Sequence, residues 1–245
     1  MWQANSPMAT PRTGGSRILL NNGKVLAIGG SGEEGARVID CELFDLSSHT
    51  WSPTPALPFA LDPYTFVVRL DDGKVLVGGG QPADSAGIVC SLYDPATGTW
   101  TAVGSPADFS SQPTGNLLPG GQVLLVGGYD RNGVPVSDCH LYDPAIGDWR
   151  TIENLPTPRS HHTATLLPNG KVLVVGGREE RYGPPTAAAL LFDPATGAWS
   201  NSPSLSRPRI SHTATLLSNG KVLLVGGSDE AGMTKSVEEY DAEER

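Results

Sequence analysis

Residues 170–177 read Gly-Lys-Val-Leu-Val-Val-Gly-Gly, and this stretch decides the fold. The nearly unbroken apolar run of residues 171–175 predicts a strand that is buried on both faces. The preceding Asn169-Gly170 pair favours a tight hairpin turn, and the glycine doublet ends the strand. The stretch therefore predicts the second strand of an antiparallel hairpin whose first strand covers residues 162–167.

The same unit occurs five times along the 245 residues. Each copy has Gly, then Lys or Gln, then Val-Leu, at residues 23–26, 73–76, 121–124, 170–173 and 220–223. A glycine doublet follows at residues 29–30, 79–80, 127–128, 176–177 and 226–227. An aromatic-Asp pair comes next, at residues 44–45, 93–94, 142–143, 192–193 and 240–241. The tryptophans Trp2, Trp51, Trp100, Trp149 and Trp199 are spaced 49, 49, 49 and 50 residues apart. Such self-similarity predicts a repeat architecture.

The order of glycine doublet, Tyr-Asp and tryptophan, with a period near 50 residues, resembles the Kelch repeat over essentially the whole chain. Residues 159–167 and 209–217 also share Arg-x-x-His-Thr-Ala-Thr-Leu-Leu, which is similar to bacterial Kelch-type repeats. The resemblance implies a β-propeller and an interaction module, because Kelch propellers mostly bind other molecules. Familiar Kelch propellers more often have six or seven blades, so five copies depart from that pattern.

Each copy predicts one four-stranded antiparallel blade. In the fourth copy the third strand covers residues 187–192, a turn follows at residues 193–197, and Trp199 lies on the fourth strand. We therefore expect an all-β fold, a five-bladed β-propeller in a single domain over residues 1–245. The glycine doublets are expected to let the backbones of neighbouring blades approach closely.

The two ends of the sequence are in phase with the repeat. Elsewhere the aromatic residue of each pair precedes a tryptophan by seven positions, as Tyr93 precedes Trp100. Continuing from Arg245 to Met1 places Trp2 seven positions after Tyr240. We expect the N-terminal strand to complete the last blade and close the ring, which would leave a monomer without free sheet edges.

Charge and hydropathy limit the partners and locations. The net charge of −9 and the lack of a basic run argue against a nucleic-acid partner. No apolar stretch approaches the roughly 20 residues of a membrane-spanning helix, and residues 1–5 do not look like a signal peptide. A mature secreted domain would look the same, so cytoplasmic and secreted locations both stay open.

The three cysteines, Cys41, Cys90 and Cys139, occupy one repeat position, where the other copies have Ala189 and Val237. A position that accepts Cys, Ala or Val is typical of a small buried core site. Equivalent positions on different blades are expected to lie beyond the roughly 7 Å Cα separation that a disulfide allows. We therefore expect three free thiols and no metal site or cofactor. Some Kelch-like propellers are copper oxidases with a Tyr-Cys cofactor, and three equivalent buried cysteines do not favour that chemistry.

Function is expected on the face with variable loops. The loops between second and third strands differ among the copies, at residues 31–37, 81–87, 129–134, 178–185 and 228–235. The turns at the opposite end of each blade are short and repetitive. Because binding residues concentrate on loops that a rigid scaffold holds, we expect the ligand on the variable face.

The start of each first strand is expected to lie nearest the propeller axis on this face. One repeat position there holds Arg12, Asp62, Ser110, Arg159 and Arg209, and a position two residues later holds Gly14, Tyr64, Gln112, His161 and Ser211. The candidate ligand-binding residues at this channel mouth are Arg12, Asp62, Tyr64, Ser110, Gln112, Arg159, His161 and Arg209. Arginine suits carboxylate or phosphate groups, so we expect an acidic ligand. The alternative is that the arginines pair with neighbouring acids and only hold loops in place.

No catalytic motif is present: the sequence has no P-loop, Gly-x-Ser-x-Gly, His-Glu-x-x-His or Cys-x-x-Cys. The sequence therefore favours a binding or scaffolding propeller over an enzyme, with a protein or glycan ligand on the variable face. Two alternatives stay open. One is an enzyme with its site at the channel mouth, such as an isomerase, a lyase or a metal-assisted hydrolase. The other is a purely structural or engineered propeller.

Overall fold

The fold is all-β, as predicted. A computed structural model describes residues 5–60, 65–79, 89–106 and 111–242, and within these ranges the strands form antiparallel sheets in chain order. The described residues contain one helical segment, the short 3-10 turn η1 (Glu33–Gly35). No helix in the described part of the chain is long and apolar enough to cross a membrane.

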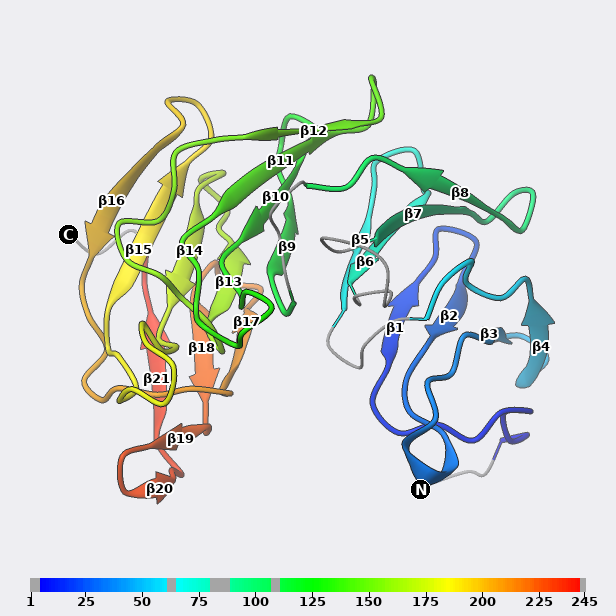
Figure 1. The fold of residues 1–245 in the computed structure, drawn as a ribbon, viewed down its shortest axis with the longest axis horizontal. Helices are drawn as coiled ribbons and strands as arrows, with labels where there is room; N and C mark the ends of the chain where they lie inside the picture. Colours follow the sequence, from blue (N-terminus) through cyan, green and yellow to red (C-terminus); the bar gives the residue numbers. More distant parts are fainter. Residues whose placement is uncertain (1–4, 61–64, 80–88, 107–110, 243–245) are drawn as a thin grey trace. The chain divides into compact units, whose positions relative to one another are not determined.

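Five blades follow one another along the chain (Figure 1). Blade 1 contains β1 (Ser16–Leu19), β2 (Lys24–Ile28), β3 (Cys41–Asp45) and β4 (Thr50–Thr54). Blade 2 contains β5 (Phe66–Arg69), β6 (Val75–Gly79), β7 (Val89–Asp94) and β8 (Thr99–Val103). Blade 3 contains β9 (Thr114–Leu117), β10 (Val123–Val126), β11 (Cys139–Asp143) and β12 (Asp148–Thr151). Blade 4 contains β13 (Thr163–Leu166), β14 (Val172–Val175), β15 (Ala189–Asp193) and β16 (Ala198–Ser202).

Blade 5 has three described strands, β17 (Thr213–Leu216), β18 (Val222–Val225) and β21 (Val237–Tyr240). A separate two-stranded hairpin, β19 (Ser228–Asp229) and β20 (Gly232–Met233), projects from this blade (Figure 1). The predicted completion of blade 5 by Trp2 falls on residues 1–4, outside the described residues. Ring closure therefore stays a prediction.

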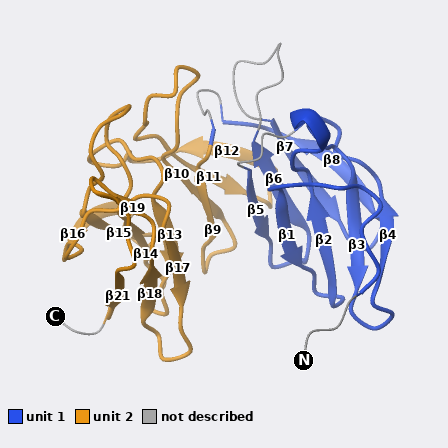
Figure 2. Cartoon of the chain, turned by 90° about the horizontal axis from the view of Figure 1, so that it is seen from below, with its two compact units in different colours: residues 1–111 blue, residues 112–245 orange. Residues whose placement is uncertain are grey.

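The chain divides into two compact units, each described here by itself (Figure 2). Unit 1, Met1–Ser111, contains blades 1 and 2, and unit 2, Gln112–Arg245, contains blades 3 to 5. A single domain over residues 1–245 stays a prediction.

The hydrophobic core of each unit lies between neighbouring blades. In unit 2 one cluster joins Leu124 and Val126 of blade 3 to Val172, Val174 and Phe192 of blade 4. In unit 1 a similar cluster joins blades 1 and 2. The second strands β6, β10 and β14 are buried on both faces, as their apolar sequence predicts, whereas Val225 of β18 in blade 5 is exposed.

The repeated aromatic residues form one contact in every complete blade. Each pair opposes across the third and fourth strands, with ring centroids 5.0 Å apart: Phe44–Trp51, Tyr93–Trp100, Tyr142–Trp149 and Phe192–Trp199. The indole of Trp199 also donates a hydrogen bond to the carbonyl of Glu153 in the preceding blade, at 3.0 Å. These tryptophans therefore serve packing within and between blades.

The glycine doublets allow close approach of backbones, as predicted. A Cβ atom on Gly176 would lie 2.6 Å from the carbonyl oxygen of Arg209 in the next blade, and one on Gly177 would lie 2.5 Å from the carbonyl oxygen of Ser160. The amide of Gly177 donates to the same Arg209 carbonyl at 2.8 Å. Both glycines have a positive φ, so a side chain would be strained as well as crowded.

The three cysteines are free and buried, as predicted. Burial is the main cause that raises the pKa of Cys41 to about 11 and that of Cys90 and Cys139 to about 12. Such thiols are almost entirely protonated at neutral pH and react slowly, because the thiolate is the nucleophile.

Candidate binding face

The first-strand starts hold the residues that the sequence singled out. The structure describes five of the eight: Arg12 in unit 1, and Gln112, Arg159, His161 and Arg209 in unit 2. Asp62, Tyr64 and Ser110 lie outside the described residues. In unit 2 the first strands β9, β13 and β17 lie side by side, so the starts of three neighbouring blades gather at one end of the unit.

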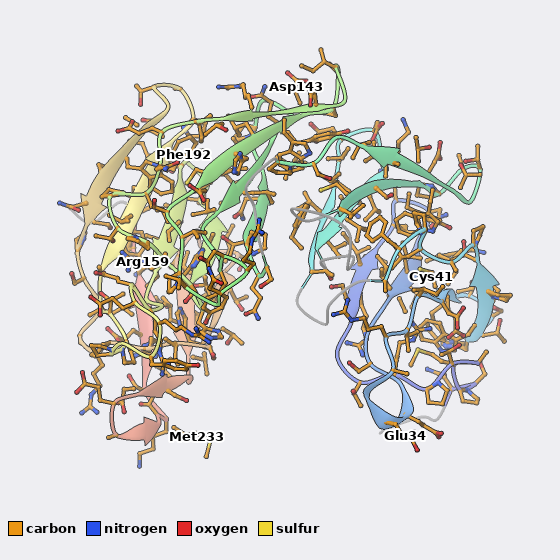
Figure 3. The ribbon with its side chains drawn as sticks, in the orientation of Figure 1. Glu34, Cys41, Asp143, Arg159, Phe192 and Met233 are labelled. Carbon is orange, nitrogen blue, oxygen red and sulfur yellow. The ribbon has the colours of Figure 1, made fainter. Side chains whose placement is uncertain are left out.

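The three arginines hold the ends of their own blades together. In each, Nη1 donates to the carbonyl oxygen of the first glycine of the doublet: Arg12 to Gly29 at 2.9 Å, Arg159 to Gly176 at 3.2 Å and Arg209 to Gly226 at 3.2 Å. The side chains are almost completely buried, with 2, 1 and 0% exposure. Figure 3 shows Arg159 within its unit. The three guanidinium groups therefore lie beneath the surface of their own blades.

Each arginine also has a carboxylate partner. Arg12 Nη2 lies 2.9 Å from Glu42 Oε1, and Arg209 Nη2 forms the equivalent short contact with Glu238. Glu42 and Glu238 occupy one repeat position on the third strand. Blade 4 has Leu190 at this position, and there Arg159 contacts Glu179 at 3.4 Å instead.

The carboxylates of Glu42 and Glu238 accept hydrogen bonds from the backbone segment that precedes the arginine of the same blade. Burial acts to raise the pKa of Glu42, but hydrogen bonds from the amides of Ala9 and Thr10 and the pairing with Arg12 outweigh it and hold the pKa below its usual value. The pKa of Glu238 is lowered in the same way, against burial, by the amide of Ser206 and by Arg209. Arginine, carboxylate and entering backbone thus form one repeated structural unit.

The position two residues after the arginine has an unusual backbone. Gln112, His161 and Ser211 all have a positive φ, between 53° and 63°, and blade 1 has Gly14 with a φ of 64°. This left-handed conformation is costly for residues other than glycine. The amide of Ser211 donates to the carbonyl of His161 at 3.2 Å, which helps to keep these two residues in place.

His161 is a half-buried imidazole beside a phenol and a guanidinium. Its ring packs edge-on against Tyr129, with centroids 5.3 Å apart. Burial and then the charge of Arg178 lower the pKa of His161, so the ring is neutral at pH 7. Tyr129 and Arg178 each directly follow a glycine doublet, and this position was not among the predicted site residues.

The next residue, His162 or His212, is structural. His162 Nε2 bonds to Thr114 Oγ1 of the preceding blade at 2.9 Å, and His212 Nε2 bonds to Thr163 Oγ1 at 2.9 Å. Both rings are buried. The adjacent His161 and His162 thus contact different groups. Within the described residues, no three His, Cys, Asp or Glu side chains lie close enough together to hold a metal ion.

The most exposed large side chains of this face lie on the variable loops. Tyr182 is 81% exposed and Met233 is 96% exposed (Figure 3 shows Met233 at the end of its hairpin). We call these exposed loop residues the loop patch, namely Val134, Arg181 and Tyr182 on the loops of blades 3 and 4 and Met233 on the hairpin of blade 5. The sequence predicted that these loops are variable, but it did not predict which of their side chains are exposed to solvent.

Interactions within and between the loops hold part of the loop patch in one arrangement. The guanidinium carbon of Arg181 lies 5.0 Å from the centroid of the Tyr182 ring. Arg181 also lies against Gly133 in the loop of blade 3, and its charge is among the causes that lower the pKa of Asp130, after the hydrogen bond from the Val134 amide. Asp130 Oδ1 accepts from the amides of Asn132 and Val134 at 2.8 Å each, which closes that loop.

Comparisons with known proteins agree on the fold. The family model of the KLHDC2/KLHL20/DRC7 Kelch-repeats domain matches residues 1–177. Among solved structures, one described as "Structure of YjhT" is similar with a TM-score of 0.74 and 17% sequence identity, over 98% of this chain and 88% of that chain. At that identity the likeness concerns the fold alone. A comparison with curated protein sequences gives no match.

Proposed function

Because the chain belongs to the family of the KLHDC2/KLHL20/DRC7 Kelch-repeats domain, whose propellers are typically protein-interaction scaffolds, we propose that it is a protein-binding module. The proposed binding surface is the loop patch of unit 2. The observation that carries this proposal is the exposed Tyr182, held against Arg181 on a loop that packs on its neighbour.

Tyrosine and arginine suit this use. Both residue types are enriched among the side chains that dominate binding energy in protein interfaces. Tyrosine offers a large amphipathic surface with few rotatable bonds, so little entropy is lost when a partner covers it. A patch that is already ordered before binding also avoids part of the ordering cost.

The channel-mouth residues have a different place in this proposal. The burial and pairing of Arg12, Arg159 and Arg209 support the alternative that the arginines brace the blades. Gln112 and His161 keep partly accessible side chains beside the loops, and we retain them as residues that a partner contacts. Recognition of an acidic group by the arginines stays a prediction.

The test is selection of a peptide ligand on the full chain, followed by variants of the loop patch. A random peptide library displayed on phage is panned against the immobilised protein, and the selected peptides are measured by calorimetry. We expect Tyr182→Ala to weaken their binding at least tenfold, which corresponds to about 1.4 kcal/mol.

The matched control is Leu46→Ala, because Leu46 is 52% exposed on a repetitive turn. Its affinity is expected to stay within twofold of the parent, and both variants should melt like the parent. Peptides that bind the Tyr182→Ala protein as tightly as the parent would contradict the proposed surface.

A further inference from the structure

The repetitive face of unit 2 contains a groove that departs from the repeat. It lies between blades 3 and 4, encloses about 370 Å³, and is lined by Leu118, Pro119, Gly120, Gln122, Leu141, Asn169, Gly170, Asp193, Pro194 and Ala195. Leu118 and Leu141 are buried and form an apolar floor. The corresponding groove between blades 1 and 2 encloses about 220 Å³. A volume of several hundred Å³ with an apolar lining and few polar groups is typical of a ligand site.

Blade 3 lacks the lysine that the other four blades have at this end. In three blades that lysine pairs with the aspartate of the aromatic-Asp pair: Lys24–Asp45 at 3.3 Å, Lys171–Asp193 at 3.1 Å and Lys221–Asp241 at 3.1 Å. In blade 2, Lys74 pairs with Asp72. Blade 3 has Gln122, whose Nε2 donates to Asp143 Oδ2 at 3.0 Å. Asp143 therefore keeps a hydrogen bond but has no cationic partner among the described residues.

Two further substitutions distinguish the same end of blade 3. Gly120 stands where the other copies have Asn or Asp. A Cβ there would meet nothing within 4 Å, so the space that a side chain occupies in the other blades is open in blade 3. Ile146 stands where the second and fourth copies have Thr97 and Thr196, and it is 76% exposed. Blade 3 thus presents an open groove and an apolar side chain where the repeat presents polar ones.

The groove has a free acceptor and a carboxylate. Gln122 Oε1 has no hydrogen bond within the described part of the chain. Asp193 is the charged residue among those that line the groove, and its carboxylate pairs with Lys171 at 3.1 Å. Asp143, without a cationic partner among the described residues, lies beside the groove as the acceptor from Gln122, and the net charge of the protein is −9. Charge complementarity therefore favours a cation.

We infer that this groove binds the arginine side chain of a basic peptide segment. The planar guanidinium donates to the Gln122 amide oxygen and to the Asp193 carboxylate, which its fork of donors matches better than an ammonium does. Its methylene stem covers Leu118 and Leu141. This surface is distinct from the loop patch, because Asp143 and Met233 lie at opposite ends of unit 2 (Figure 3).

The test uses the full chain and the probe acetyl-Gly-Arg-Gly-amide. Binding is followed by NMR at low ionic strength, with the analogue in which citrulline replaces arginine. We expect shifts confined to the amides around Gln122, Asn169 and Ala195, a citrulline analogue that binds at least tenfold more weakly, and weaker binding at high salt.

The decisive variant is Gln122→Lys, which restores the residue of the other blades and supplies Asp143 with its cation. Because the other four blades have lysine at this position, the variant is expected to fold. Its affinity for the probe should be at least tenfold lower than that of the parent. The matched control, Lys24→Gln in blade 1, should leave probe binding unchanged. The inference would be overturned if the probe bound Gln122→Lys as tightly as the parent, or if the shifts mapped elsewhere. It would also be overturned if no shift appeared at about 10 mM probe, which would mean a binding free energy weaker than about 3 kcal/mol.

Discussion

Arg209 is of a residue type that often binds ligands, but its surroundings give it a structural role. Its guanidinium bonds to the carbonyls of Gly226 and Ser236, to the Ser236 hydroxyl and to Glu238, and none of the side chain is exposed. Both terminal nitrogens therefore donate to groups of its own blade, and Nε is buried without a partner. The same holds for Arg12 with Gly29, Asp40 and Glu42.

This arrangement predicts a loss of stability when the arginine is removed. Arg209→Ala would leave Glu238 without its cationic partner and remove the side-chain donor to the Gly226 carbonyl, so we expect the free energy of unfolding to fall by about 3 kcal/mol. Urea denaturation measures this change. The control is Arg207→Ala, an exposed neighbour, which should change stability by less than about 0.5 kcal/mol. If Arg209→Ala were as stable as the parent, the interpretation of the arginine as a structural brace would be wrong, and the hypothesis that the arginines bind an acidic ligand would be favoured.

At the scale of elements, the glycine doublet is where one blade meets the next. Gly127 and Gly176 have a positive φ, and a Cβ on either would meet the arginine carbonyl of the following blade. Hydrogen bonds from Gly128 to Arg159 and from Gly177 to Arg209, each of 2.8 Å, then join the blades of unit 2 directly. The side-chain bonds of His162 and His212 to threonine reinforce the same junctions.

Two glycines of similar backbone conformation separate crowding from strain. Gly176 has a φ of 64°, and a Cβ there would lie 2.6 Å from the Arg209 carbonyl, whereas Gly197 has a φ of 72° and open space around it. We expect Gly176→Ala to cost about 2 kcal/mol more than Gly197→Ala in thermal or chemical unfolding, because only the first must displace the next blade. Equal costs would show that conformation alone requires glycine at the doublet.

At the scale of the whole molecule, buried histidines make stability depend on pH. Burial, followed by the charges of Arg159, His212 and His161, lowers the pKa of His162 to about 3. Burial and Arg209 lower the pKa of His212 to about 4. The ordinary value in the unfolded chain is about 6.5. Unfolding thus takes up protons at any pH between these values, and the folded state is favoured by high pH.

The resulting stabilisation is fully present above pH 6.5 and is lost as the pH falls toward the folded-state values. Between pH 7 and pH 5 we expect each of the two histidines to cost on the order of 1–2 kcal/mol, measured by urea denaturation across that range. His162→Gln with His212→Gln should flatten the dependence, because an amide has no charge to acquire. Glu42 and Glu238 lose their own contribution only near and below pH 4.5, outside this window. A parent protein equally stable at pH 7 and pH 5 would contradict this prediction.

The sequence alone determined the blades. Strand identity, the turns, the aromatic contacts and the burial of the cysteines follow from short apolar runs, glycine and tryptophan at a constant period, because each blade repeats the same local physics. Tertiary structure decided the site. The direction of the Arg209 side chain depends on Glu238, which lies 29 residues away and in contact only after β21 pairs with β18. The exposure of Tyr182 and the opening of the groove at Gln122 likewise depend on what the adjoining blade covers, and no pattern within one repeat contains that information.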